Sequence, residues 1–246
     1  MPNYRAANFS SDRWSRIENP TTHETLRIEG ASVELVDDFL CGVVNTNRWT
    51  EVDVGDSTKA ISGGVLTYHL HVTGETEEAG IYSRDSKDFN LDKGVIFEAR
   101  LAVHVAPTVG GEFLIGFQND NYSTGSNRIL NADETAIYAA FGFYATLGAG
   151  LTAAIRTDDS VNASGIISSA TSVLVDTYHV YRIDCTDVTN VKFYIDGARV
   201  ASSTTFVMSQ GSNVMVQPII LAQKNGVDAG LGDIYVDYIK MWQLSR

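Results

Sequence analysis

Two histidines with alternating spacing are the first residues whose types suggest metal chemistry. His69 and His71 stand two residues apart in an alternating segment, so both side chains lie on one face of the expected strand. Such a pair holds zinc only when a third ligand joins it, and the sequence identifies none. We therefore expect both histidines to face solvent rather than to bind zinc.

A long polar loop, residues 119–134, is the segment best suited to contact a ligand. Loops longer than about 12–15 residues are often functional. This loop combines amides, a carboxylate, an aromatic ring and a guanidinium, as a lectin-type site does. It is equally suited to contact another subunit. The candidate ligand-binding residues are Asn119, Asp120, Asn121, Tyr122, Asn127 and Arg128.

Residues 1–30 differ from the rest of the chain and are predicted to form an extended arm. Asn, Ser, Arg and Thr dominate, and neither a period of two nor one of 3.6 is sustained. Arms that lie across neighbouring subunits link an assembly at low cost. We expect inter-subunit contacts here, with a single folded domain over residues 31–246. The contacting residues are predicted to be Tyr4, Arg5, Phe9, Arg13, Trp14, Arg16 and Ile17.

The elements that position these candidates are predicted to be β-strands. The segment Tyr178–Ser202 alternates apolar and polar residues, and it contains Asp196-Gly197, a pair that accepts the positive φ angles of a type I′ turn. Its spacing predicts a meander of three antiparallel strands. Other short strands are separated by glycine-rich turns, and no window shows a capped helix. An all-β sandwich or barrel is therefore expected.

Composition and charge exclude two classes of binding partner from those expected. The 246 residues carry a formal net charge of -12. An acidic protein repels phosphate backbones and anionic lipid headgroups, so neither nucleic acid nor a membrane is expected as a partner. No apolar run approaches the ~18 residues of a membrane span. The chain begins without the apolar segment of a secretion signal, which predicts synthesis in the cytoplasm of a host cell.

Two cysteines permit at most one disulfide. Cys185 has the same strand parity as the apolar residues of the meander, and Cys41 stands far from it in the sequence. A chain made in a reducing cytosol keeps its thiols reduced. Both cysteines are therefore expected to be buried and free.

Three motifs together resemble one fold family. The first is Asp38-Phe39 followed by Trp49 and Gly64-Val65-Leu66, the second is the meander Tyr181–Gly197, and the third is the closing strand Val236–Trp242. In this order and spacing the chain resembles the concanavalin A-like lectin/glucanase jelly roll, in its laminin-G-like and family 16 glycosidase-like branches. The resemblance implies an all-β, two-sheet antiparallel β-sandwich. It says little about function, because this fold hosts enzymes, lectins and virion proteins.

The resemblance also implies a structural calcium ion and no other cofactor. In the family, an Asp of the last strand joins carbonyl oxygens near the N-terminal strand. Asp237 falls at the matching position, and Asp38 could approach it. Calcium takes six to eight oxygen ligands, so two acids, carbonyls and water would suffice. The alternative is an Asp237 that only hydrogen-bonds to the first strand.

The glycosidase branch carries a strand motif Glu-x-Asp-x-x-Glu, whose carboxyls flank the scissile bond. The segment Glu51–Asp56 is similar, but it ends in Asp, contains Gly55 and stands on the first strand of the body. The family motif belongs on a later strand, near residues 112–118, which has one carboxylate. We therefore expect no catalytic residues and no enzyme activity, with Glu51 and Asp53 at a solvated strand end.

These features together predict a non-enzymatic structural virion protein, such as a phage capsid decoration (cement) or surface protein. Its expected partners are other virion subunits or copies of itself in a homo-oligomer, and its expected location is the virion. The alternative is a carbohydrate-binding, lectin-like module that recognises a cell-surface glycan. A second alternative is a glycoside hydrolase or polysaccharide lyase.

Overall fold

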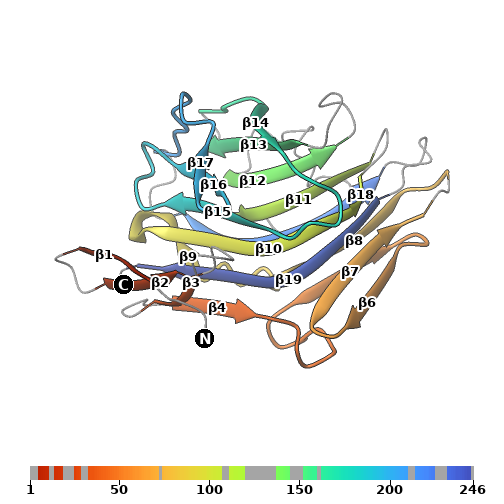
Figure 1. Ribbon diagram of the computed structural model, residues 1–246. Helices are drawn as coiled ribbons and strands as arrows, with labels where there is room; N and C mark the ends of the chain where they lie inside the picture. Colours follow the sequence, from red (N-terminus) through yellow and green to blue (C-terminus); the bar gives the residue numbers. More distant parts are fainter. Residues whose placement is uncertain are drawn as a thin grey trace.

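Two large antiparallel β-sheets packed face to face make up the computed structural model (Figure 1). This architecture confirms the predicted two-sheet β-sandwich. The structure describes residues 5–10, 14–18, 25–28, 33–71, 74–106, 111–119, 137–144, 152–159, 162–209, 214–224 and 232–244. Within these ranges the only helix is the short 3₁₀ turn η1 (Leu91–Lys93), and no helix there is long and apolar enough to cross a membrane.

The first sheet contains eight strands. They are β4 (Val33–Asp37), β6 (Thr58–Ser62), β7 (Val65–Leu70), β10 (Val95–Val105), β15 (His179–Cys185), β16 (Lys192–Ile195), β17 (Ala198–Val200) and β19 (Gly232–Gln243). Seven follow the order β17-β16-β15-β10-β19-β7-β6. β4 and β7 pair with different halves of β19, so they lie end to end along the same side of it.

The second sheet also contains eight strands. They are β5 (Thr50–Val54), β8 (Glu77–Tyr82), β9 (Phe89–Asn90), β11 (Gly111–Gln118), β12 (Ile137–Tyr144), β13 (Thr152–Asp159), β14 (Ile167–Ser172) and β18 (Met215–Lys224). Seven follow the order β14-β13-β12-β11-β18-β8-β5, and β9 pairs with the start of β18. The central strands of this sheet are β11 and β18.

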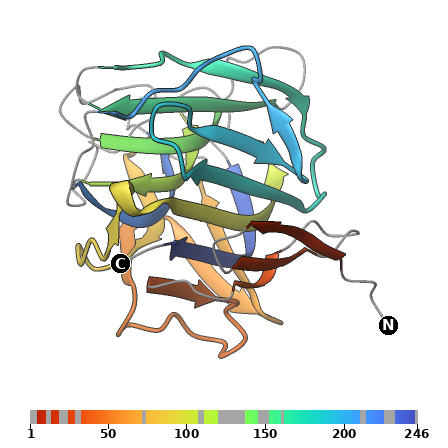
Figure 2. The ribbon, with the colours of Figure 1, turned by 90° about the vertical axis from the view of Figure 1, so that its left-hand side faces the viewer.

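The N-terminal segment, predicted to be an extended arm, contains three short strands. β1 (Arg5–Ser10), β2 (Trp14–Glu18) and β3 (Thr25–Ile28) form a separate antiparallel sheet. Figures 1 and 2 place this small sheet at one end of the sandwich. The division of the chain at residue 30 remains a prediction.

The core between the two large sheets is rich in aromatic side chains. Phe141 of β12 meets Tyr181 of β15 and Phe193 of β16 edge to face, with ring centroids 5.2 and 5.3 Å apart. These contacts join the two sheets directly. Each such ring removes a large apolar surface from water and adds about 0.5–1.5 kcal/mol through its geometry.

The meander that the sequence predicts is present. Ile195 pairs with Ala198, so Asp196 and Gly197 form a two-residue turn. Their φ angles are 50° and 77°, which confirms the expected type I′ turn. The side chain of Asp196 also accepts a hydrogen bond from the Val180 amide at 2.8 Å, which fixes the turn against β15.

A β-bulge interrupts β19 at Asp237. Arg100 pairs with Tyr238 and Leu101 pairs with Val236, so Asp237 has no partner across the strand. Before the bulge Val236 faces the core, and after it Ile239 does. The extra residue therefore shifts the side-chain alternation, and both halves of this long strand keep their apolar residues inside.

The two cysteines are free, as predicted, but only one of them is buried. Cys185 faces the core. Cys41 is exposed, so the expectation of burial is wrong for this residue. It lies in the loop that follows β4, next to Leu40, which is also exposed, and not on an inward-facing strand position.

The sheets end in short or irregular edge strands. β17 has only three residues, and β14 contains Ala170 with a φ angle of 56°. The pairing of β13 with β14 shifts register between Thr152 and Ala154. β6, the edge of the first sheet, is largely exposed and carries Lys59.

Candidate functional site

The outer face of the second sheet carries polar side chains that are buried. The outer face of a one-sided antiparallel sheet is normally solvated. Here β11 turns its phenylalanines to the core and Glu112, Leu114 and Gln118 outward, yet all three outward side chains are buried. We call this surface the polar face. Its buried polar residues are Glu78, Glu112, Gln118, Tyr138, Arg156, Asp158, Gln217 and Gln223.

One end of the polar face is a row of three side chains across the central strands. Glu112 pairs with Gln223 across β11 and β18, and Gln223 pairs with Glu78 across β18 and β8. The Gln223 Nε2 donates to Glu112 Oε1. The Gln223 Oε1 is buried and has no hydrogen bond within the described ranges of the chain. With one strand between them, the backbones at Glu112 and Glu78 are about 9–10 Å apart.

The other end of the polar face groups Tyr138, Arg156 and Asp158 on β12 and β13. The Arg156 guanidinium carbon lies 5.8 Å from the centre of the Tyr138 ring. An Arg156 nitrogen, NH2, lies 3.7 Å from Asp158 Oδ2. Burial raises the pKa of the Tyr138 phenol, with smaller contributions from Asp158 and Glu112, while Arg156 opposes the rise.

The Tyr138 hydroxyl is buried and makes no hydrogen bond with any residue that the structure describes. Leaving such a group unsatisfied costs about 1–3 kcal/mol. Most buried polar atoms in proteins are paired, so each exception calls for an explanation, such as a role in binding. Tyr138 Oη and Gln223 Oε1 are such atoms, and they lie at opposite ends of the polar face.

Glycines form part of the polar face between these ends. A Cβ added at Gly116 would lie 2.2 Å from the Ala139 carbonyl oxygen, and one at Gly80 would lie 2.3 Å from the Ile220 carbonyl oxygen. No other residue fits at either position without a backbone shift. The polar ends are therefore separated by a stretch of small and aliphatic residues.

The predicted ligand-binding loop is described only at its start. Asn119 closes the ends of β11 and β12, since its Oδ1 accepts from the Ile137 amide at 2.7 Å and its own amide donates to the Ile137 carbonyl at 2.9 Å. This is a structural role for the side chain. The other candidates, Asp120, Asn121, Tyr122, Asn127 and Arg128, lie outside the described residues.

The residues predicted for assembly contacts lie in or beside the small N-terminal sheet. Tyr4 and Arg13 lie outside the described residues. The others are on strands whose backbone alone is described: Arg5 and Phe9 on β1, and Trp14, Arg16 and Ile17 on β2. Their role in subunit contacts remains a prediction.

The two acids predicted for calcium belong to neighbouring strands but bond elsewhere. β4 ends at Asp37, opposite Ile239, so Asp38 and Asp237 both lie within two residues of this pair. Asp237 accepts a hydrogen bond from Arg100, and Asp38 Oδ1 accepts one from the Leu40 amide. Among the described residues no three His, Cys, Asp or Glu side chains are grouped to hold a metal ion. Calcium binding remains a prediction.

The segment resembling a glycosidase motif lies at the edge of the second sheet. Glu51 forms an ion pair with Lys59 of β6, and Asp53 is exposed and accepts from the Ser57 hydroxyl at 3.3 Å. Val52, which lies between them, packs against the apolar residues in the middle of the polar face. Both acids therefore point away from that face.

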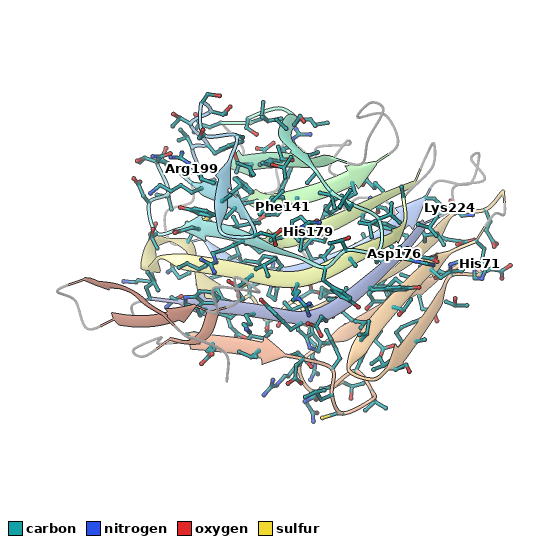
Figure 3. The ribbon with its side chains drawn as sticks, viewed as in Figure 1. His71, Phe141, Asp176, His179, Arg199 and Lys224 are labelled. Atoms are coloured by element: carbon teal, nitrogen blue, oxygen red, sulfur yellow. The ribbon has the colours of Figure 1, made fainter. Side chains whose placement is uncertain are left out.

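The two alternating histidines each keep about a third of the side chain exposed, and both lie beside carboxylates. His69 pairs with Asp233, and its ring meets that of His71 at 4.5 Å. His71 lies 3.9 Å from the buried Glu77, which forms a 3.1 Å ion pair with Lys224. Figure 3 shows His71 and Lys224 at the same end of the sandwich. Neighbouring strands supply the carboxylate partners, which the sequence spacing could not reveal.

Most of the polar face was missed from the sequence. The strand carrying Glu112 was recognised as holding one carboxylate, but Tyr138, Arg156 and Gln223 were not singled out. Arg156 and Asp158 lie in the polar run Arg156-Thr157-Asp158-Asp159, which is typical of a solvated strand end. Only the pairing of β11, β12, β13 and β18 brings these residues together.

No family model and no curated protein matches the chain. Several solved structures do match the chain. The Emp47p carbohydrate recognition domain has a TM-score of 0.59 at 11% identity and covers 85% of this chain and 94% of its own. A structure reported with endo-acting O-glycanases of the human gut microbiota has a TM-score of 0.57 at 16% identity, covering 86% and 99%. LamAcat from Zobellia galactanivorans has a TM-score of 0.56 at 13% identity, covering 85% and 96%.

At such low identity these likenesses show the fold alone, a two-sheet β-sandwich consistent with a concanavalin A-like fold. The similar structures include both carbohydrate recognition domains and glycan-degrading enzymes, so they do not decide whether this chain is an enzyme. A related domain, that of Emp46p, has a potassium-bound form. The expected virion role gains no support from these likenesses and remains a prediction.

Proposed function

We propose that the protein binds neutral glycans through the polar face of its second sheet. The observation that carries the proposal is a pair of buried polar atoms without hydrogen bonds, Tyr138 Oη and Gln223 Oε1, among buried carboxylates and amides. One sugar hydroxyl can donate to Gln223 Oε1, and a different sugar hydroxyl can accept from the Tyr138 hydroxyl. The fold shared with carbohydrate recognition domains adds support.

The charge of the polar face favours neutral glycans over acidic ones. Its described residues include three carboxylates, on Glu78, Glu112 and Asp158, and one guanidinium, on Arg156. A sulfated or uronic-acid glycan would meet like charge at both ends. Carboxylates and amides bond well to neutral sugar hydroxyls, and the ring of Tyr138 offers an apolar surface to the C–H side of a sugar.

Burial implies that a bound glycan is enclosed. Glu112 is 3% exposed and Gln223 is fully buried. A ligand that reaches these groups therefore loses most of its contact with water, which suits one or two sugar units better than a long chain lying on a surface. Binding that requires such a face to open associates slowly.

The proposal is tested with a glycan array followed by titration calorimetry on the best ligand. We expect binding to neutral oligosaccharides, and a loss of affinity of about tenfold or more for Glu112→Gln, because the amide cannot accept as strongly as a carboxylate. Glu51→Gln is the matched control, since that acid points away from the polar face. An array without hits, or equal affinity for Glu112→Gln and the wild type, would refute the proposal.

Glycan hydrolysis is a second candidate, favoured by one observation. Inverting glycosidases hold their two carboxyls about 6.5–9.5 Å apart, close to the 9–10 Å (about two strand spacings) between the backbones at Glu112 and Glu78. A reducing-sugar assay on the oligosaccharides that bind decides this. Release of sugar that is abolished in both Glu112→Gln and Glu78→Gln supports hydrolysis, and binding without release excludes it.

A further inference from the structure

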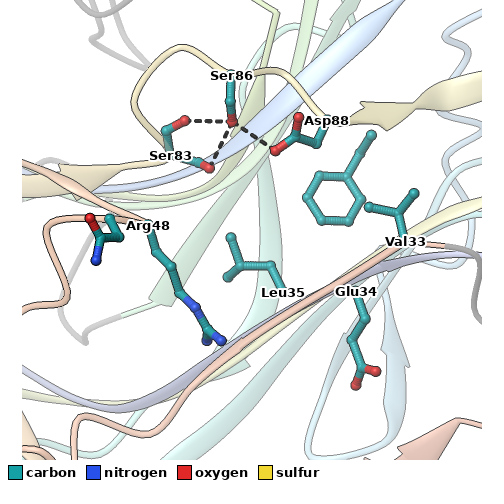
Figure 4. Close-up of a pocket in the computed structure, with 9 residues that line it drawn as sticks. Val33, Glu34, Leu35, Arg48, Ser83, Ser86 and Asp88 are labelled. Carbon is teal, nitrogen blue, oxygen red and sulfur yellow. Dashed lines mark hydrogen bonds between the residues drawn. The ribbon is translucent and has the colours of Figure 1, made fainter.

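A pocket of about 250 Å³ opens on another part of the molecule, between β4 and the segment 83–89 that joins β8 to β9 (Figure 4). Its walls come from both large sheets. Val33, Leu35 and Phe89 provide apolar surface, while Arg48, Ser86 and Asp88 provide polar groups. The pocket shares no lining residue with the polar face.

One wall of the pocket is an ordered hydrogen-bonding group. The Ser86 hydroxyl lies 2.8 Å from the Ser83 carbonyl oxygen, 2.9 Å from Asp88 Oδ2 and 3.2 Å from the Ser83 hydroxyl (Figure 4). A hydroxyl has one proton and two lone pairs, so Ser86 donates to one of these oxygens and can accept from another donor. Asp88 is exposed and keeps lone pairs for a ligand.

This wall is built before any ligand arrives. Arg84, Asp85 and Lys87 have φ angles of 53°, 56° and 48°, a left-handed conformation that is costly for residues other than glycine. Asp85 and the buried Gln217 hold the segment in place: the Asp85 amide donates to Gln217 Oε1 at 2.9 Å, and Gln217 Nε2 donates to Asp85 Oδ1 at 2.7 Å. Preorganisation of this kind lowers the cost of binding.

The opposite wall carries charge without an ion-pair partner. Arg48 donates one hydrogen bond, from NH1 to the Val36 carbonyl at 2.6 Å, which leaves most of its five N–H groups available. Within the described part of the chain, none of Arg48, Glu34 and Asp88 forms an ion pair. All three line the pocket and are exposed.

We propose that this pocket binds one neutral sugar unit, as a site separate from the polar face. Its volume lies below the roughly 300–1,000 Å³ of pockets for drug-sized ligands, which suits a single ring. The apolar residues can meet the C–H side of the ring, and the carboxylates, hydroxyls and guanidinium can bond to its hydroxyls. Two carboxylates against one guanidinium disfavour an acidic sugar.

The proposal is tested by titrating isotope-labelled protein with D-glucose, D-galactose, D-mannose and N-acetyl-D-glucosamine and following the backbone amides by NMR. We expect saturable shifts at residues 83–89 and at Arg48 with at least one sugar. A ligand this small supports a Kd on the order of 1 mM or weaker. Asp88→Asn should weaken that binding by about tenfold.

Asp56→Asn is the matched control, because Asp56 is exposed and lies outside the pocket. Saturable shifts that need about tenfold more sugar in Asp88→Asn but are unchanged in Asp56→Asn and Glu112→Gln support the pocket. Shifts confined to the polar face, or none with any of the four sugars, overturn it. Because Glu112→Gln acts on the polar face alone, failure of one site is distinguishable from failure of the other.

Discussion

Both large sheets bury polar side chains on their outer faces, but the hydrogen bonding of these side chains differs. On the first sheet Glu98 is fully buried and bonds to Arg182 Nε at 2.7 Å, to Arg182 NH2 at 2.6 Å and to the Tyr238 hydroxyl at 3.0 Å, with Lys240 at 4.0 Å. On the second sheet Tyr138 Oη and Gln223 Oε1 are buried without hydrogen bonds.

Buried charge alone therefore does not indicate a binding site in this molecule. A buried carboxylate that bonds to both a guanidinium and a phenol already has its partners within the fold, so it stabilises structure. A buried hydroxyl and a buried amide oxygen that lack partners mark a surface whose bonding is incomplete. The difference assigns a structural role to the cluster around Glu98 and binding to the polar face, and four measurements test that assignment.

The largest effect is expected from Arg182→Ala. The substitution leaves the carboxylate of Glu98 buried without its main cation, and such changes cost about 3–5 kcal/mol. Urea unfolding measures the loss. The double variant Glu98→Gln with Arg182→Met removes both charges and should cost less than the single change. Equal losses in the two variants would show that the pair is not the stabilising unit.

A smaller loss is expected from Gly116→Ala on the polar face. The new Cβ would press on the Ala139 carbonyl at 2.2 Å, and overpacking of this kind costs about 1–3 kcal/mol. Gly165→Ala is the comparison, because a Cβ there meets open space and only the positive φ of 68° is strained. If thermal unfolding shows Gly116→Ala to be the milder change, the polar face relaxes more easily than the structure implies.

Removing the hydroxyl of Tyr238 should lower the free energy of unfolding, whereas removing that of Tyr138 should not. Tyr238→Phe breaks a hydrogen bond to a carboxylate and should destabilise the fold by about 1.5–3 kcal/mol. Tyr138→Phe removes an unsatisfied hydroxyl, so it should leave stability unchanged or raise it by up to about 1 kcal/mol, while weakening glycan binding. The contrast between the faces fails if both variants lose stability equally.

The smallest expected effect is a loss of stability at high pH, which is absent at neutral pH. Burial raises the pKa of Tyr138 above its ordinary 10.0, so the fold favours the neutral phenol. This contribution to stability is complete below pH 10 and is lost as the pH rises beyond it. Burial also raises the pKa of the more exposed Tyr178, Asp237 adds to that rise, and Arg100 opposes it. Tyrosinate absorbance should show Tyr178 ionising first, and Tyr138→Phe should unfold at a higher pH than the wild type. Ionisation of Tyr138 before Tyr178 would contradict this.

Local sequence patterns predicted the elements well, because turns and alternation depend on near neighbours. Asp196-Gly197 specified its turn through the φ angles that these residues tolerate. Residues 94–105 also alternate in the sequence, and the structure has Phe97 facing the core and Glu98 facing outward. The bulge at Asp237 also corresponds to a feature of the sequence. The core-facing aliphatic residues are two apart before Val236, but Val236 and Ile239 are three apart.

The site could not be predicted in the same way. An outward Glu98 or Glu112 has the same local pattern whether water or protein covers it, so its burial depends on contacts between distant segments. The row Glu112–Gln223–Glu78 joins three strands that are far apart in the sequence, and only sheet order makes them neighbours. The pocket likewise depends on β4 and residues 83–89 meeting at one side of the sandwich.

The irregular edge strands also bear on how the protein behaves at high concentration. An open sheet edge exposes unpaired backbone groups that can add a strand from another molecule and start aggregation. Here the first sheet ends in the three-residue β17 and in β6, which carries Lys59, while left-handed Ala170 distorts β14 at the end of the second. These three edges offer poor templates for further strands, so aggregation through them should be slow.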